Sequence, residues 1–471
     1  MNIKGIIYYL SLFCFPISVL AFLNILYSSY SDYFLNIESY TGSLFVSLIL
    51  GIIFYFIGRN STKQINFQEQ LILIVLIYLT SSALISIPFY FSNYQITLIN
   101  SLFESFSGLT GTGFTIFKNV KYLDPTLLIW RSLSQWLGGL YFLIFLILFF
   151  SNTKFQYKLN NLAYSSNKSL NLEINIKNIL YKIFFLYLSL TILIFVLFSA
   201  SNIRLFSSLN LSMTLISTGG FLSTNFLSQI IKTTTQELIL ALSFIFAILN
   251  IFLINNIFNR KKLKEHYEDF LIVILIIFFS MILFFSTKNI NFLDILINVT
   301  SSLSNSGIST SKIPDNYSLY LIFLTIIGGS IISNTSGIKF LRFYILLKAT
   351  YIEMLKIVKP YNIFNSNILF SENKITNENI KISFYIFISF FISVFTLCGI
   401  LLLDDFNFEN SFKLSILTLT NTAISISYGM NVVEFGNLLT SSKIFIIIFM
   451  IIGKIELLSI ILIINKIFYK K

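Results

Sequence analysis

Long apolar segments alternate along this chain with short apolar segments that end in glycine and hydroxyl residues. Two long segments come first, at Ile6–Leu26 and Thr41–Ile57. A helix that crosses a bilayer needs about 20 predominantly apolar residues. The pattern therefore predicts a leading pair of transmembrane helices within residues 1–66.

From Gln68 onward, one unit of segments occurs four times. The first unit has a span at Leu71–Phe91, a short helix at Ile96–Leu109, a loop around Gly113 and a returning span at Leu127–Phe150. Such a short segment can enter a membrane and return if its irregular backbone lines protein or water. The other units comprise Ile179–Phe198, Arg204–Ile216, Ser217–Phe221 and Leu238–Ile257; Phe270–Phe285, Phe292–Leu303, Ser304–Ile308 and a long run from Leu319; and Ile382–Leu403, Phe408–Leu419, Thr420–Ile424 and Ile444–Ile464. Ordinary outer loops with amphipathic helices are the alternative, but all four short helices fall at the same place in the unit.

Basic residues indicate that all four units have the same orientation. Every second connection is rich in lysine or arginine, as expected of cytoplasmic loops. These clusters lie at Arg59–Lys63, Lys154–Lys182, Arg260–Lys264, Lys339–Lys381 and Lys466–Lys471. Parallel repeats favour a pseudo-fourfold axis normal to the membrane, whereas inverted repeats would favour a secondary transporter.

We therefore predict an all-α polytopic membrane protein. It has ten spans and four short pore helices around a pseudo-fourfold central pore, with both termini in the cytoplasm. The predicted boundaries are 1–66 for the leading pair, then 67–160, 161–265, 266–365 and 366–471 for the four repeats.

Composition narrows the class of protein further. The 471 residues are 56% hydrophobic and 11% charged, whereas soluble domains are about 25% charged. The net charge of +12 is explained by cytoplasmic loops, so no nucleic-acid partner is expected. Cys14 and Cys398 lie in apolar runs and His266, the single histidine, in a basic loop. They suggest no disulfide framework, metal centre or histidine-based catalysis, and no enzyme is expected.

The four loops could form a selectivity filter for cations. Potassium channel filters replace the water shell of an ion with rings of backbone carbonyls. The expected ring-forming residues are Thr112, Thr218, Ser306 and Thr422, with an adjoining ring from Gly111, Ser217, Asn305 and Asn421. The negative C-terminal dipole ends of the four short helices would favour cations without a ring of acidic side chains.

The residue after each ring-forming hydroxyl is expected to need unusual backbone freedom. Gly113, Gly219 and Gly307 supply it, because glycine has no Cβ. The fourth loop has Ala423 instead. A Cβ disfavours positive φ by roughly 1 kcal/mol or more, so the fourth carbonyl is expected to be displaced. Side-chain oxygens of Asn305 and Asn421 would either compensate or line the vestibule.

With the loops assigned, the chain resembles the Trk/Ktr/HKT superfamily of potassium transporters, and most of all its Trk-type membrane subunit. That subunit has an extra helix pair before its four repeats. The resemblance covers nearly the whole chain and is carried by Phe103–Gly113, Trp130–Gly139, Ser217–Phe221, Gly328–Lys339 and Gly453–Glu456. Two departures are Ala423, where the family pattern has glycine, and Lys454, where it has arginine.

The resemblance implies channel-like K⁺ uptake through the cytoplasmic (inner) membrane, with K⁺ bound at the filter residues. It also implies a homodimer and a cytosolic regulatory ring that binds nucleotide. This chain contains no Rossmann glycine fingerprint and no P-loop, so nucleotide control would come from that partner. The basic segments Lys154–Lys182 and Lys339–Lys381 are expected to dock an acidic surface of the ring, although topology alone could explain them.

A gate is expected below the filter, in the run Leu319–Leu347, which is too long and mixed for one straight helix. Its middle contains Gly328, Gly329, Ser333, Asn334, Thr335, Ser336, Gly337 and Lys339. One interpretation is a kinked helix whose small residues pack against a neighbour. The resemblance favours the other, a broken helix whose polar loop Gly328–Lys339 gates the pore.

Three charged residues lie within apolar segments, and each is expected to have a structural or functional role. Intramembrane charges usually face a cavity or a partner, so Lys454 is expected to face the ion path and oppose cations. The alternative is that Lys454 extends to the cytoplasmic surface. Glu104 and Arg131 are expected to hold a pore helix against its neighbour.

Two other functions remain open at this stage. The nearest alternative is a sodium-permeable or poorly selective cation transporter of the same superfamily. The resemblance implies that a small residue in place of a filter glycine allows sodium to permeate. A secondary transporter of an organic substrate is less consistent with the sequence, because no inverted repeat is found.

Overall fold

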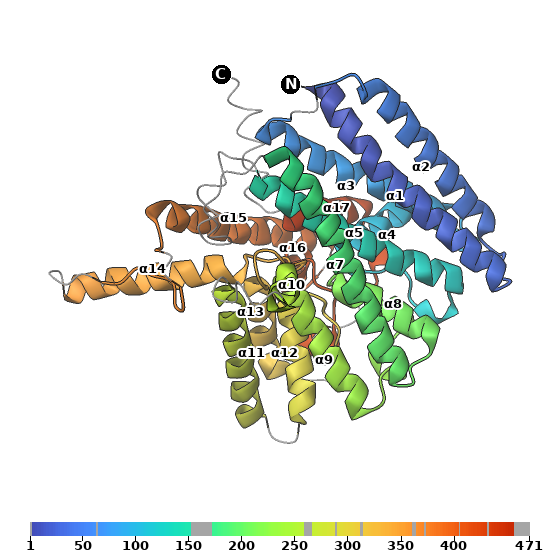
Figure 1. Ribbon diagram of the computed structural model, residues 1–471. Helices are drawn as coiled ribbons and strands as arrows, with labels where there is room; N and C mark the ends of the chain where they lie inside the picture. The colour runs from blue at the N-terminus through green and yellow to red at the C-terminus, as the bar shows by residue number, and fades with distance from the viewer. Residues whose placement is uncertain are drawn as a thin grey trace.

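The computed structural model of the chain is built almost entirely from helices (Figure 1). It describes residues 2–62, 65–151, 172–258, 266–287, 290–310, 314–359, 364–371, 374–404, 406–430 and 433–455. Within these ranges, β structure is limited to one isolated bridge between Asn367 and Lys374. The prediction of an all-α protein is confirmed.

The first two helices, α1 (Ile3–Tyr30) and α2 (Ile37–Gly58), form the predicted leading pair. They lie side by side in Figure 1. A Cβ on Gly58 would lie 2.6 Å from the backbone of Tyr8, so the two helices approach closely at this glycine. Small residues permit such close contacts between membrane helices.

The four repeats follow in chain order. Their helices are α3 (Phe67–Tyr90), α4 (Leu98–Thr110) and α5 (Pro125–Ser151); α7 (Leu172–Ala200), α8 (Leu205–Ile216), α9 (Thr234–Ile248) and α10 (Ile251–Phe258); α11 (Tyr267–Ser286), α12 (Phe292–Ser304), α13 (Ser318–Ile327) and α14 (Phe340–Val358); and α15 (Asn377–Leu401), α16 (Phe408–Leu419) and α17 (Thr440–Ile455). The short helices α4, α8, α12 and α16 correspond closely to the predicted pore helices.

Six helices in the described part of the chain are long and apolar enough to cross a membrane, namely α1, α2, α3, α7, α11 and α15. Their outward faces carry exposed apolar side chains such as Phe45, Phe185 and Phe278. The C-terminal halves of the pore helices are buried instead, and Thr110, Ser304 and Thr420 have no exposed surface. The pore helices therefore end inside the protein, surrounded by the longer helices.

One predicted span is broken where a single helix was expected. The run Leu238–Ile257 divides into α9 and α10, separated by Leu249 and Asn250. The N–H of Asn250 donates to Oδ1 of Asp269 at 2.9 Å, and the Asn250 side-chain oxygen accepts the N–H of Phe252 at 3.0 Å. These bonds replace the helical bonds lost at the break, so the prediction of one continuous helix was wrong.

The second break lies in the third repeat. Helix α13 ends before Gly328, whose φ is 68°, and α14 begins after Lys339, whose φ is 75°. Residues 328–339, which we call the gate segment, are non-helical. The kinked-helix interpretation is therefore excluded, and the expected interruption of this span is confirmed.

Candidate ion pathway

The four pore helices end in the same backbone turn. In each turn one N–H donates to the carbonyl five residues earlier, an arrangement that commonly closes helix C-termini. The four bonds are Thr112 to Ser107 at 3.0 Å, Gly219 to Thr214 at 2.8 Å, Ser306 to Ser301 at 3.2 Å and Thr422 to Leu417 at 2.9 Å. The residue before each donor has positive φ: Gly111 at 76°, Thr218 at 56°, Asn305 at 63° and Asn421 at 49°.

This turn fixes the equivalence of the four loops, and it shifts the second loop by one residue from the sequence alignment. Gly219, not Thr218, is equivalent to Thr112, and Thr218, not Ser217, is equivalent to Gly111. A side-chain hydrogen bond supports the same equivalence of the first and second loops. The hydroxyls of Ser107 and Thr214 donate to the carbonyls seven residues later, at Phe114 and Phe221.

Gly220 is the residue that the alignment missed. It stands where the other loops have Gly113, Gly307 and Ala423. The signal was present in the sequence, because a phenylalanine follows both Gly113 and Gly220. We call residues 111–114, 218–221, 305–308 and 421–424 the filter loops.

The filter loops converge at these four positions. A Cβ added to Gly113 would lie 2.7 Å from Cα of Gly220 and 2.9 Å from Cβ of Ala423. A Cβ on Gly220 would lie 2.1 Å from Cβ of Ala423 and 2.9 Å from the carbonyl oxygen of Ser306. A Cβ on Gly307 would lie 2.0 Å from the Ala423 carbonyl oxygen. Contacts under 3.0 Å are not tolerated between such atoms, so the four loops meet at one point.

Backbone conformation at this meeting point differs between alternate repeats. Gly113 and Gly307 have positive φ, at 78° and 67°. Gly220 and Ala423 are not among the residues with positive φ. The expectation that Ala423 suffers left-handed strain was therefore wrong, because its methyl group is compatible with the conformation that it adopts.

Hydroxyl and amide side chains connect the loops. Paired hydroxyls occur in three of them, Thr110 with Thr112 at 2.7 Å, Ser304 with Ser306 at 3.1 Å and Thr420 with Thr422 at 2.9 Å. The amide of Asn305 donates to Thr422 Oγ1 at 3.2 Å, and that of Asn421 donates to Thr112 Oγ1 at 2.9 Å. The two asparagines therefore join the third loop to the fourth and the fourth loop to the first through their amide nitrogens.

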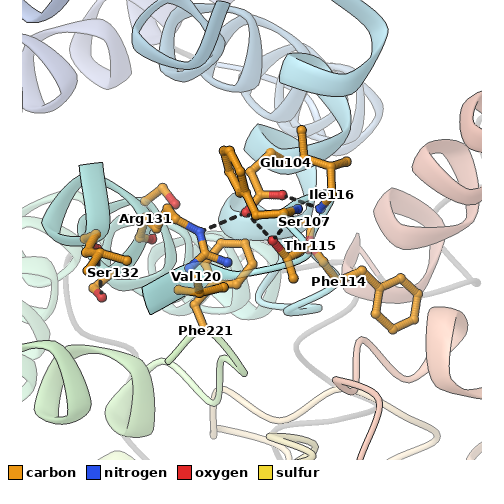
Figure 2. A network of polar contacts seen from close by, with 12 residues as sticks. Glu104, Ser107, Phe114, Thr115, Ile116, Val120, Arg131, Ser132 and Phe221 are labelled. Atoms are coloured by element: carbon orange, nitrogen blue, oxygen red, sulfur yellow. Dashed lines mark hydrogen bonds and ion pairs between the residues drawn. The ribbon is translucent and has the colours of Figure 1, made fainter. Parts of the chain in front are cut away.

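A buried ion pair holds the first filter loop to the second (Figure 2). The side chain of Arg131 on α5 donates to Oε1 of Glu104 on α4 at 2.8 Å, and both are essentially unexposed. Glu104 also accepts the Thr115 hydroxyl at 3.0 Å and the Ile116 N–H at 2.9 Å. The guanidinium lies 4.0 Å from the centre of the Phe221 ring. The expected role of Glu104 and Arg131 in holding the pore helix is supported by this geometry.

An open cavity of about 490 Å³ lies on one side of the filter loops. Gly113, Gly220, Gly307 and Ala423 are all part of its lining. The lining residues include several with hydroxyl or amide side chains and two basic residues, Lys118 and Arg131, but no carboxylate. The point where the filter loops meet therefore faces this cavity.

The gate segment lies against the opposite side of the filter loops. The Thr218 hydroxyl donates to the Asn334 carbonyl at 3.2 Å, and the Asn334 amide donates to the Ile216 carbonyl at 2.7 Å. The Ser336 N–H donates to Oδ1 of Asn305 at 3.1 Å. These bonds hold the segment directly to the ends of α8 and α12.

Lys339 fixes the shape of the gate segment from within. Its ammonium donates to the carbonyls of Thr335, Ser333 and Ser330 at 2.5, 3.2 and 3.3 Å. Lys339 is 1% exposed. It is therefore unable to form part of the docking surface expected for Lys339–Lys381.

Lys454 reaches the gate segment from α17. Its ammonium donates to the Asn334 carbonyl at 3.0 Å and lies 4.6 Å from the centre of the Phe142 ring. A Cβ on Gly111 would lie 3.8 Å from it. Because Lys454 is 2% exposed, its side chain does not extend to the surface, which removes that alternative.

The two broken helices are joined to each other. The Ser330 N–H donates to the Ile248 carbonyl at 3.0 Å, and the Ile251 N–H donates to the Ile332 carbonyl at 3.2 Å. Two consecutive carboxylates of α11 support this junction. Glu268 accepts the Ile331 N–H at 2.9 Å, as Asp269 accepts that of Asn250.

These features define a multi-pass helical membrane protein with four re-entrant loops arranged around one axis. The chain belongs to the TrkH family, described as a cation transport protein family, whose pattern matches residues 37–268 and 308–469. The predicted resemblance is thereby confirmed. A transport family also confirms the prediction that the protein is not an enzyme.

Several relatives share long stretches with this chain. It is 25% identical over 456 residues to the Trk system potassium uptake protein TrkG of Escherichia coli, covering 91% of this chain and 92% of that protein. It is 28% identical over 315 residues to an uncharacterized cation transporter of Methanocaldococcus jannaschii, covering 65% of each.

A solved structure shows the same fold. The crystal structure of the potassium transporter TrkH from Vibrio parahaemolyticus superposes with a TM-score of 0.87 over 100% of both chains, at 19% identity. At this identity the likeness establishes the fold, while the assignments of the filter and gate residues remain predictions.

The close packing of the filter loops can be tested by a pair of substitutions, one of which should rescue the other. Gly220→Ala should abolish most ion uptake, because its methyl would lie 2.1 Å from the Ala423 methyl. Adding Ala423→Gly should restore part of the uptake, since only the 2.9 Å contact with the Ser306 carbonyl would remain. Uptake of a tracer cation into proteoliposomes measures both. Gly399→Ala is the control, because nothing lies within 4 Å of that position. Full uptake by Gly220→Ala would contradict the proposed meeting point.

The buried ion pair predicts a stability difference. Arg131→Met should destabilise the protein by about 3–5 kcal/mol, because it leaves the Glu104 carboxylate buried without its partner charge. Glu104→Gln added to Arg131→Met should recover part of that loss. Thermal unfolding in detergent measures the effect. Lys356→Met, which breaks an exposed pair with Glu353, should change stability by less than about 1 kcal/mol. Equal effects at the two pairs would contradict the prediction.

Proposed function

We propose that this chain is the membrane subunit of a potassium uptake system and conducts K⁺ through the four filter loops. The observation that carries the proposal is the convergence of four equivalent turns at Gly113, Gly220, Gly307 and Ala423. Relatives named Trk system potassium uptake proteins support K⁺ as the ion.

The proposed ion ligands are backbone oxygens. Following the structural equivalence, they come from Gly111, Thr218, Asn305 and Asn421 and from the next residues Thr112, Gly219, Ser306 and Thr422. Four helix C-termini carry partial negative charge toward this region. A dehydrated cation is thereby stabilised without any acidic side chain in the cavity lining.

The gate segment and Lys454 would close the pathway. The segment occupies the side of the filter loops opposite the cavity, and the Lys454 ammonium lies between it and the first loop. A cation that passes a fixed ammonium at a distance of about 4 Å meets a repulsion of roughly 4 kcal/mol at an effective dielectric constant of 20. Conduction therefore requires both the segment and the ammonium to move.

A homodimer and a cytosolic nucleotide-binding ring are proposed as partners. The relatives' name, Trk system, supports a subunit that works with others. Most of the basic stretch Lys154–Lys182 lies outside the described residues. In the other stretch Lys339 and Arg342 are buried, whereas Lys356 is exposed. Contact with the ring would therefore use the later part of α14.

The direct test is uptake of external tracer ⁸⁶Rb⁺ into K⁺-loaded proteoliposomes that contain the purified chain. Accumulation that unlabelled K⁺ abolishes, and that an amino acid mixture leaves unchanged, supports the proposal. Protein-dependent uptake of the amino acids without Rb⁺ uptake would instead support an organic-substrate transporter and overturn the proposal.

A sodium-permeable transporter of the same family is the second candidate. It is favoured by Ala423, the one side chain with a Cβ where the filter loops meet. Ala423→Gly should raise the K⁺/Na⁺ permeability ratio, because it restores a glycine at the fourth loop. The ratio is obtained from reversal potentials in mixed solutions, with Gly399→Ala as control. An unchanged ratio would show that the three glycines already set the selectivity.

Lys454 should limit leak through the closed pathway. Lys454→Met should raise cation leak about tenfold or more, the effect of lowering a barrier by about 1.4 kcal/mol. Lys443→Met is a matched control on the same helix, because Lys443 is also buried but bonds Asn100 and the Gly436 carbonyl. Leak is measured as Rb⁺ efflux without any partner protein. Equal leak in the two variants would contradict a blocking role.

A further inference from the structure

The second filter loop lacks a side chain that the other three share. Thr112, Ser306 and Thr422 each carry a hydroxyl that pairs with the hydroxyl two residues earlier. The equivalent residue in the second loop is Gly219, although a serine, Ser217, stands two residues before it. The space that a hydroxyl occupies elsewhere must therefore be filled by another group.

Gln135 of α5 fills that space. A Cβ on Gly219 would lie 2.2 Å from Gln135 Oε1, 2.3 Å from Cδ and 2.8 Å from Nε2. Gln135 is 0% exposed. The side chain therefore occupies the position that a residue larger than glycine would need.

The orientation of the glutamine amide is set by the filter loop itself. The N–H of Phe221 donates to Gln135 Oε1 at 3.2 Å. Gln135 Nε2 has no hydrogen-bond partner among the described residues. The amide is therefore held through its oxygen, and that oxygen in turn fixes the backbone directly after Gly220.

We infer that Gln135 is a positioning residue for the filter, acting in place of the missing hydroxyl at Gly219. It holds the backbone of residues 219–221 where their carbonyls can contribute to the ring. This inference rests on the proposed K⁺ pathway and deepens it. It assigns discrimination between K⁺ and Na⁺ partly to a side chain outside the filter loops.

The inference explains why the second loop has two consecutive glycines. Gly220 is required by the contact with Ala423, and Gly219 is required by the contact with Gln135. Neither residue has positive φ. Both are therefore glycine because of space rather than because of backbone conformation.

A swap of side chains tests the inference. Gln135→Ala should lower the K⁺/Na⁺ permeability ratio several-fold, because the Phe221 N–H loses its acceptor and the loop relaxes. Gly219→Ser alone should lower K⁺ uptake and the K⁺/Na⁺ permeability ratio, because its Cβ would lie 2.2 Å from Gln135 Oε1 and displace that amide from the Phe221 N–H. The double variant should regain uptake and part of the ratio, since it recreates the Ser-x-Ser pairing of the third loop, Ser304 with Ser306.

The readouts are Rb⁺ uptake and reversal potential in the same bilayers, with Gly399→Ser as the control for a serine at an unpacked glycine. Gln135→Met, which retains the length of the side chain and loses the acceptor, is measured beside Gln135→Ala and replaces it if that variant does not insert. If Gln135 only filled space, the K⁺/Na⁺ permeability ratio of Gln135→Met would equal that of the unmodified protein.

Two results would overturn the inference. One is a native ratio in Gln135→Met, and the other is a double variant that gains nothing over Gly219→Ser. A different result would show that the proposed K⁺ pathway itself is wrong. In that case the unmodified protein would show no Rb⁺ uptake that unlabelled K⁺ abolishes.

Discussion

Four backbones approach one another so closely at the centre of this protein that almost no side chain fits between them. Gly113, Gly220 and Gly307 have neighbouring backbone or methyl atoms within 3.0 Å of where a Cβ would stand. Everything around this point serves to bring the backbones together. The short helices end there, the Glu104–Arg131 pair ties two loops, and the Asn305 and Asn421 amides join successive loops. Since these groups are buried, the hydrogen bonds that they make are to other protein groups.

The polar contacts of the filter loops differ between the cavity side and the side of the gate segment. On the cavity side, the contacts join the loops to their own pore helices and, through Arg131, the first loop to the second. On the other side, the contacts run from the loops to the gate segment, through Thr218, Asn334 and Asn305. Opening the gate segment would therefore remove partners from residues of the filter loops. The two parts of the pathway depend on each other through these few bonds.

Much of this architecture could be predicted from the sequence, because membrane spans and pore helices are set by local apolar patterns. Helix α16 has the predicted bounds Phe408–Leu419, and the interruption at 328–339 was visible as small polar residues in an apolar run. The register of the second loop was missed, because Ser217-Thr218-Gly219-Gly220 offers two alignments of hydroxyl and glycine, and only the phenylalanine after Gly113 and Gly220 distinguishes them. The break between α9 and α10 depends on Asp269, a residue of another helix. A contact with a residue of another helix cannot be read from the pattern of apolar residues along the segment itself.

The junction of the two broken helices has a mechanical consequence. Two backbone bonds join the end of α9 and the start of α10 to the gate segment. Glu268 and Asp269 of α11 bind the gate segment and the α9–α10 break, respectively, so a displacement of α10 would also displace the segment. Each such bond contributes about 1 kcal/mol net, and somewhat more to a charged acceptor. The four bonds together contribute about 5 kcal/mol or more, which exceeds the roughly 1–3 kcal/mol by which one ligand typically couples to a distant site. A ligand of that coupling strength would therefore move the two broken helices together rather than separate them.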